Sequence, residues 1–134
     1  MVSRAVASPR QPIWEYLLDT RTATANFAHF DTPYCFVGHT RLPVLYYLPD
    51  ESQMASLVIP ENNTQLTLAP RSIVNPGSVG QPRDRDRRAA YGILDTDEYV
   101  FHFRRAEYDI VAVQDRMRAA NLPERHITRL EVGW

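Results

Sequence analysis

The fold of this chain is decided by the stretch Cys35-Phe36-Val37-Gly38-His39-Thr40-Arg41-Leu42-Pro43, read together with Ile73-Val74-Asn75-Pro76-Gly77-Ser78-Val79-Gly80. Each stretch opens with a short run of β-branched or aromatic residues, which predicts a buried strand, and continues with polar and glycine residues that predict a loop. Residues two apart in a strand point the same way, so His39 and Arg41 are expected to project into one cleft. The alternative is that His39 is a satisfied core histidine and Arg41 a solvated loop charge.

Three segments resemble motifs of the calcineurin-like metallophosphoesterase family. The run from Gly38 to Pro43 is similar to the G-H-T-H-x-P signature of that family. Residues 73–91 resemble N-P-G-S-V-G-Q-P-R-D-G-D-P-R-A-x-Y, a segment of its small bacterial and archaeal phosphodiesterase branch. Residues 8–17 are similar to the S-P-R-x-P-x-W-E-Y run of the same branch. The earlier family motifs D-x-H, G-D-x-x-D and G-N-H have no counterpart in this sequence, so the resemblance covers the second half of the family pattern.

The resemblance implies an α+β fold, half of a two-sheet sandwich with flanking helices, completed by oligomerisation or by a partner chain. In the family the missing half supplies most of one sheet, and the strand that starts at Tyr34 is apolar on both faces. We therefore expect one face or edge of this strand to be uncovered, a feature that favours association. The expected partner is a second copy of the chain or a separately encoded N-terminal half.

A dinuclear metal centre is also implied by the resemblance, and His39 matches one of its histidine ligands. Arg41 stands where the family has a second histidine, and Val6 stands where it has another. A guanidinium has no lone pair for a cation and is not deprotonated in proteins, so Arg41 repels a metal ion. His39 is then the one metal ligand that the resemblance places. We expect no stably bound cofactor, and a divalent ion such as Mn, Fe, Zn or Ni only if the missing ligands are supplied.

The polar loop at residues 76–88 departs from the family pattern, because D-G-D-P-R reads Asp84-Arg85-Asp86-Arg87-Arg88 here. Losing the glycine introduces strain if position 85 needs a positive φ. One interpretation is an anion-binding patch in which Arg41 replaces the metal as a fixed cation. Its expected members are Arg41, Asn75, Gly77, Ser78, Arg83 and Arg88. The alternative, which we favour for the loop, is that Asp84 and Asp86 neutralise their neighbours on a solvated surface. A purely structural role for the turn at residues 75–78 is equally compatible with the sequence.

Composition narrows the class of protein. The chain has 134 residues, 44% of them hydrophobic, and a net charge of -1, so residues 1–134 can bury one core as a single domain. The charge argues against nucleic acid as a partner. One cysteine, Cys35, allows no disulfide framework, which favours a reducing cytoplasm. No apolar run approaches the length of a membrane span, and the first residues lack the hydrophobic core of a signal peptide.

Helices are predicted at four places from capping residues and apolar spacing. Pro12 suits the first turn of a helix that continues to Leu18. Asp19 or Thr20 caps a second helix that reaches Phe30. A third helix is capped by Asp109 and ended by Asn121, and Pro123 opens the last one. The inner positions of these last two helices are expected to be Ile110, Val113, Met117, Ala120, Ile127 and Leu130.

Strands are predicted at residues 34–38 and 44–48, with a turn at 49–52, and at 57–59, 65–69 and 72–75, where they are expected to form a meander. Residues 90–94 and 99–103 are predicted to form a hairpin with Tyr99, Phe101 and Phe103 on one face.

Two functions then remain open. The first is a truncated, catalytically degenerate metallophosphoesterase that serves as a scaffold or an anion-binding module. The second is a metal-dependent phosphodiesterase or phosphatase, active when a separate N-terminal half completes it. Arg41 and Val6 favour the first.

Overall fold

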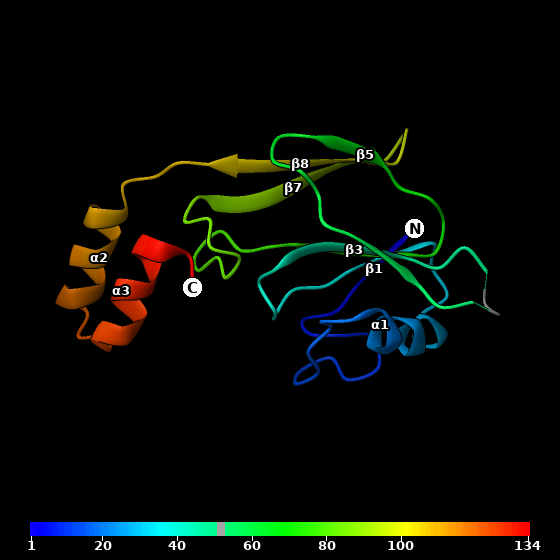
Figure 1. The fold of residues 1–134 in the computed structure, drawn as a ribbon, viewed down its shortest axis with the longest axis horizontal. Helices are drawn as coiled ribbons and strands as arrows, with labels where there is room; N and C mark the ends of the chain where they lie inside the picture. The colour runs from blue at the N-terminus through cyan, green and yellow to red at the C-terminus, as the bar shows by residue number, and fades with distance from the viewer. Residues whose placement is uncertain (51–52) are drawn as a thin grey trace.

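The computed structural model describes residues 1–50 and 53–134, which form two sheets and three α-helices (Figure 1). One sheet holds five strands in the spatial order β1 (Val2–Arg4), β2 (Tyr34–Phe36), β6 (Ser72–Pro76), β3 (Pro43–Tyr47) and β4 (Ser56–Val58). The other holds three, in the order β5 (Gln65–Thr67), β8 (Val100–Ala106) and β7 (Ala89–Asp95). In the larger sheet β2 runs parallel to β1 and β6, and β3 runs antiparallel to β6 and β4. The fold is therefore mixed α+β, as predicted.

Three layers enclose two cores, because each strand of the larger sheet presents alternate residues to opposite faces. Tyr34 and Val74 face the smaller sheet and pack with Phe101 and Phe103. Cys35 and Ile73 face the other way and pack under α1 (Thr20–Asn26) with Leu17 and Phe27. Figure 1 shows the larger sheet between the smaller sheet and α1. The prediction that the Tyr34 strand would be left uncovered is wrong, because these layers cover both its faces and β1 and β6 pair with both its edges.

Capping residues placed three helices correctly. The Asp19 side chain accepts a hydrogen bond from the Thr22 amide at 2.7 Å and starts α1, which tightens into the 3₁₀ helix η1 (Phe27–His29) instead of continuing to Phe30 as an α-helix. Asp109 caps α2 (Ile110–Ala119) by accepting from the Ala112 amide at 2.9 Å. Asn121 has a φ of 55° and ends it, and Pro123 precedes α3 (Glu124–Val132).

The two last helices form a hairpin beyond one end of the sheets (Figure 1). Ile127 and Leu130 are buried, as predicted. The predicted inner stripe of α2 is only partly right: Ile110, Val113 and Met117 are half-buried and Ala120 is exposed, whereas the buried residue of that helix is Gln114. The Gln114 side-chain amide donates to the carbonyl of Ile127 at 3.0 Å, which joins the two helices by a polar contact that an apolar pattern does not reveal.

No helix forms at residues 12–18, so that prediction is wrong. Residues 12–14 make a turn, and Leu17 is buried while its neighbour Leu18 is exposed. The reason is a tertiary network that fixes this segment: the Ser8 hydroxyl donates to the Glu15 carboxylate at 2.6 Å, and the Asn26 amide donates to it at 2.7 Å. These side-chain contacts hold the segment in place of the backbone hydrogen bonds that a helix would need.

The predicted meander is also wrong, because β5 leaves the larger sheet and pairs with β8 in the smaller one. β6 then returns to lie between β2 and β3. Part of the predicted turn at 49–52 lies outside the described residues. The hairpin of β7 and β8 is confirmed; Phe101 and Phe103 are buried on one face, with Tyr99 packed beside them. None of the helices in the described residues has the length and apolar character that a bilayer crossing requires. The cytoplasmic location stays a prediction.

Candidate anion-binding site

His39 and Arg41 lie in an irregular segment that follows β2, and both have a left-handed backbone, with φ of 64° and 62°. They are therefore not related by strand alternation, although both come close to Tyr16. The His39 ring lies 4.4 Å from the Tyr16 ring between centroids, and the Tyr16 phenol acts electrostatically on Arg41. Left-handed residues with a Cβ cost about 1–3 kcal/mol each, so the surrounding contacts must hold this conformation at both positions.

Asn75 supplies those contacts from the end of β6. Its buried amide nitrogen donates to the Gly38 carbonyl at 2.9 Å and to the Thr40 hydroxyl at 2.8 Å. Its side-chain oxygen accepts from the Gly77 amide at 3.0 Å, which shapes the turn where Gly77 has a φ of 88°. Ser78 closes the next turn by accepting from the Gln81 amide at 3.0 Å. The structure therefore brings the two motif stretches together, with Asn75, Gly77 and Ser78 engaged in holding the loops.

A cavity of about 310 Å³ opens beside this junction. It is lined by Tyr16, Leu18, Thr40, Leu42, Arg83, Arg129 and Trp134, which come from the N-terminal segment, the two loops and the chain end after α3. Among the residues that the structure describes, no aspartate or glutamate lines it. Arg41 lies near two of the lining residues: burial lowers the pKa of its guanidinium, and the positive charges of Arg83 and Arg129 lower it further. Two arginines therefore line the cavity, and a third positive charge lies close to them.

Three nitrogen atoms at this place are buried without a hydrogen-bond partner among the described residues. They are Nη1 of Arg41, Nε of Arg83 and Nε2 of His39. A buried donor left without a partner costs about 1–3 kcal/mol. An oxyanion in the cavity would offset the repulsion between Arg83 and Arg129, which line it, since arginine donors match the geometry of phosphate and carboxylate oxygens.

The same residues do not fit a divalent metal ion. In the part of the chain that the structure describes, no group of three or more His, Cys, Asp or Glu side chains is placed to hold one. His39 offers a single imidazole, and the positively charged Arg41 shares its segment. A metal centre in proteins needs several anionic or neutral ligands from different elements.

Arg88 lies apart from the cavity. Its Nη2 atom bonds Asp86 at 2.6 Å, and it borders a different hollow together with Glu107 and Tyr108. Asp84 and Asp86 also hold Arg105, whose side chain is only 4% exposed. The carboxylates of the loop thus pair with arginines, and one partner, Arg105, comes from β8 and was not anticipated. Position 85, where the family has glycine, does have a positive φ, of 65°.

Sequence reasoning missed Tyr16, Arg129 and Trp134 as lining residues. Each lies far along the chain from Arg41, and no local pattern signals that α3 ends against the loop. The contact that brings it there is the hydrogen bond from the Arg85 amide to the Gly133 carbonyl, 2.9 Å long. The tight approach of Gly133 to the Asp86 backbone, where a Cβ would lie 2.8 Å from the Asp86 carbonyl carbon, makes glycine necessary at that position.

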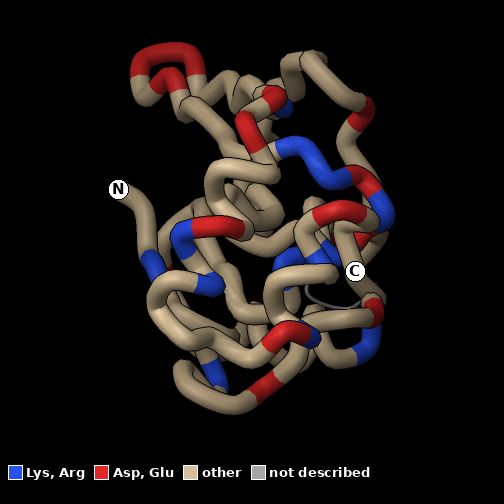
Figure 2. The backbone as a smooth tube through the Cα atoms, turned by 90° about the vertical axis from the view of Figure 1, so that its left-hand side faces the viewer, with Lys and Arg blue, Asp and Glu red and all other residues tan. Residues whose placement is uncertain are grey.

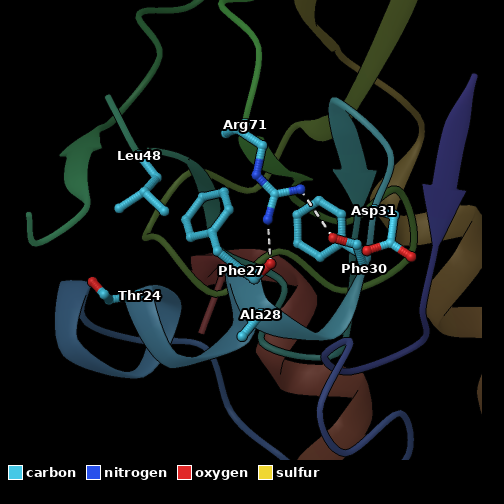
Figure 3. A pocket seen from close by; sticks show the side chains of 7 residues that line it. All are labelled: Thr24, Phe27, Ala28, Phe30, Asp31, Leu48 and Arg71. Carbon is cyan, nitrogen blue, oxygen red and sulfur yellow. Dashed lines mark hydrogen bonds between the residues drawn. The ribbon is translucent and has the colours of Figure 1, made fainter. Parts of the chain in front are cut away.

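A second cavity, of about 320 Å³, is bordered by Arg71 and lies at the end of α1 (Figure 3). Figure 3 shows the Arg71 guanidinium turned onto the carbonyls of Phe27 and Phe30. The bond to Phe30 is 2.9 Å long, and the guanidinium carbon lies 4.7 Å from the centre of the Phe30 ring. The two terminal nitrogens of this arginine satisfy the carbonyls that follow α1, whereas its Nε is buried without a partner among the described residues.

Charges of both signs are interspersed along the backbone when the molecule is viewed from the side of α2 and α3 (Figure 2). This agrees with the net charge of -1.

Comparison with known proteins shows what this chain is similar to. Its structure matches a metallophosphoesterase from Sphaerobacter thermophilus with a TM-score of 0.93 and 43% sequence identity, over 99% of this chain and 55% of that protein. It shares its fold with a hypothetical protein from Pyrococcus horikoshii, with a TM-score of 0.66 and 20% identity, over 99% of this chain and 46% of that one. It is 34% identical over 129 residues to an uncharacterised protein of Methanocaldococcus jannaschii, over 95% of this chain and 49% of the relative. The chain therefore spans about half the length of these proteins. No model of a known protein family matches it.

Proposed function

The chain carries the fold of roughly the C-terminal half of a metallophosphoesterase, and we propose that it binds phosphate or a similar oxyanion without hydrolysing phosphate esters by itself. The anion is held by Arg41, Arg83 and Arg129. One observation carries the proposal: Arg83 and Arg129 line a cavity that has no acidic lining residue among those the structure describes, and Arg41 lies close enough to feel both charges. Guanidinium donors at such a cavity are stabilised by an acceptor that enters it.

The lack of hydrolysis is proposed from the donor set. His39 is the one imidazole of this segment, and Arg41 and Val6 stand where the family motifs carry histidines. A permanently charged guanidinium beside a single imidazole disfavours a divalent cation. Catalysis by this family rests on paired metal ions that supply a nucleophile and neutralise the phosphate.

The proposal is tested by thermal unfolding of the protein in sodium phosphate and in sodium chloride of equal ionic strength. Phosphate should raise the melting temperature, because a ligand of the folded state at 100 times its Kd stabilises it by about 2.7 kcal/mol. Arg129→Gln should remove most of this phosphate effect. Arg125→Gln is the matched control, since Arg125 lies one turn earlier on α3 and is exposed. An equal response of both variants and of the unsubstituted protein would contradict the proposal.

A second candidate function is favoured by the length of the relatives. Because this chain covers 55% and 49% of two of them, a further polypeptide could complete a metallophosphoesterase site around His39. We propose that hydrolytic activity, if this chain takes part in any, requires ligands from such a polypeptide. The test is metal analysis of the purified chain and turnover of bis-p-nitrophenyl phosphate with added Mn²⁺. Stoichiometric metal and turnover by the chain alone would show that neither the anion-binding proposal nor this one is correct.

We propose further that the chain associates with a second copy or with that polypeptide. β4 pairs with β3 alone in the part of the chain that is described, so its other edge is open. An open strand edge favours association. Light scattering after size exclusion should give a mass above that of the monomer; a monomer at micromolar concentration would contradict self-association.

A further inference from the structure

A narrow apolar groove adjoins the arginine cavity. Its volume is about 170 Å³, and it shares Leu18 and Leu42 with the cavity. Its other walls are apolar side chains from the N-terminal segment and from β3 and β4, among them Val44, Leu57 and Ile59. Leu18 is 54% exposed, Leu57 40% and Ile59 71%, so the groove opens to solvent along much of its length. A ligand anchored in the cavity can therefore extend into the groove.

We infer that the cavity and the groove together bind an amphiphilic anion: a phosphate monoester whose head contacts the arginines and whose alkyl chain lies in the groove. This inference rests on the proposed anion site and names its ligand class. The phosphate head is placed by charge, because Arg83 and Arg129 line the cavity and Arg41 lies close to both. The alkyl chain is placed by the hydrophobic effect, which favours covering the exposed groove walls with apolar groups.

Asp84 fixes the orientation of the ligand. Among the described residues it is the one charged side chain that lines the groove, and its Oδ2 pairs with Arg105. Its Oδ1 is buried without a partner among the residues that the structure describes. A carboxylate in that position repels an anionic head, so the head is directed to the arginine end and the uncharged chain to the groove.

The ligand is expected as a single dissolved molecule and not as part of a bilayer. Anionic membranes attract surfaces with a continuous cluster of basic side chains. Figure 2 shows basic and acidic positions interspersed on the side from which α3 and the loop are seen, and the net charge is -1. The groove volume of about 170 Å³ also suits one short chain.

Isothermal titration with a series of monoalkyl phosphates tests the inference, each used below the concentration at which it forms micelles. Inorganic phosphate reports the head alone. From methyl to hexyl phosphate the affinity should rise by about fourfold for each methylene group, which corresponds to about 0.8 kcal/mol for each one buried. Affinity that does not depend on chain length, with inorganic phosphate still bound, would overturn this inference and leave the proposed anion site standing. If inorganic phosphate and all the esters fail to bind, the proposed anion site fails as well.

A pair of variants tests whether the alkyl chain of the ligand lies in the groove. Ile59→Ser should lower the affinity for hexyl phosphate by about tenfold and leave that for inorganic phosphate unchanged. Ile93→Ser is the matched control, because Ile93 is 56% exposed on β7 of the other sheet. Equal losses in both variants would overturn the placement.

Sedimentation with vesicles of phosphatidylcholine and phosphatidic acid tests whether the phosphate and alkyl groups come from a membrane lipid instead of a dissolved molecule. Retention on vesicles without binding of dissolved hexyl phosphate would contradict the inference. A change of Ile59→Ser from oligomer to monomer without any effect on hexyl phosphate would assign the groove to a protein contact instead.

Discussion

The side-chain amide of Asn75 donates to the hydroxyl of Thr40 across 2.8 Å, and the same nitrogen reaches the Gly38 carbonyl at 2.9 Å. These bonds tie the end of β6 to the segment that presents His39 and Arg41. Both residues of the pair are buried, Asn75 at 1% and Thr40 at 3% exposure. The conformation of the proposed anion site therefore depends on a polar contact between two segments. These segments are far apart in the sequence and meet only in the folded protein.

Replacing Asn75 with alanine should lower the free energy of unfolding by about 2–3 kcal/mol, because the buried Thr40 hydroxyl and the Gly77 amide both lose their hydrogen bond to it. Urea denaturation measures this loss. Thr40→Val removes one of the bonds and should cost about 1 kcal/mol. The same Asn75 variant should weaken phosphate binding, since Arg41 is no longer held. A larger loss in Thr40→Val than in Asn75→Ala would contradict the role given to Asn75.

Glu15 should make stability depend on pH in the acid range. Burial raises the pKa of this carboxyl group, but hydrogen bonds from Arg10, Ser8 and Asn26 outweigh burial and bring it down to about 2 from 4.5. Because the folded pKa is the lower one, the stabilisation is complete above about pH 4.5 and is lost as the pH falls toward 2. Urea denaturation across this range should show the decline.

Glu15→Gln should flatten that decline and reduce stability near neutral pH by about 2 kcal/mol, since hydrogen bonds to a charged group are lost. The control is Glu98→Gln, at an exposed position in the hairpin turn, which should change stability by no more than about 0.5 kcal/mol. If the Glu15 variant shows the same acid dependence as the unsubstituted protein, the network around Ser8 and Asn26 is not its source.

Arg85→Gly is expected to stabilise the protein by about 1 kcal/mol. The φ of 65° at this position strains a residue with a Cβ, and glycine relieves the strain. The gain is offset by the loss of the cation–π contact in which the guanidinium carbon lies 5.1 Å from the Trp134 ring, worth about 0.5–1 kcal/mol at an exposed site. Arg85→Ala loses the contact and keeps the strain, so it should be less stable than the unsubstituted protein. Melting temperatures of the two variants should therefore move in opposite directions; a shift in the same direction would argue against strain at this residue.

Features set by neighbouring residues could be predicted from the sequence. Asp19, Asp109 and Pro123 mark helix starts because a cap acts within one turn. The positive φ at position 85 followed from the glycine that the family has there. Features set by contacts between distant segments could not be predicted. No local sequence pattern indicates that Glu15 bonds to Asn26 and that its segment therefore does not form a helix. Nor does any local pattern indicate that β5 pairs with β8. Arg129 joins Arg41 only because α3 ends against the 76–88 loop. Of the cavity walls, the sequence motifs drew attention to Arg83, whereas Tyr16, Arg129 and Trp134 come together only through folding; an anion-binding role for any of them stays a prediction.

Restoring histidine at positions 6 and 41 should not restore hydrolysis. The Val6 carbonyl accepts from the Gly38 amide at 3.0 Å, so position 6 lies beside the segment that carries His39, and Val6 is 69% exposed. A Val6→His, Arg41→His double variant should fold, because neither change removes a core side chain, and the loss of Arg41 lessens its repulsion with Arg83. It should bind phosphate more weakly than the unsubstituted protein. With added Mn²⁺, turnover of bis-p-nitrophenyl phosphate should stay at the background rate, since the described residues hold no group of three or more His, Cys, Asp or Glu side chains placed to bind a metal ion. Each single variant serves as a control, and turnover that appears only in the double variant would mean that imidazoles alone complete a catalytic centre on this scaffold.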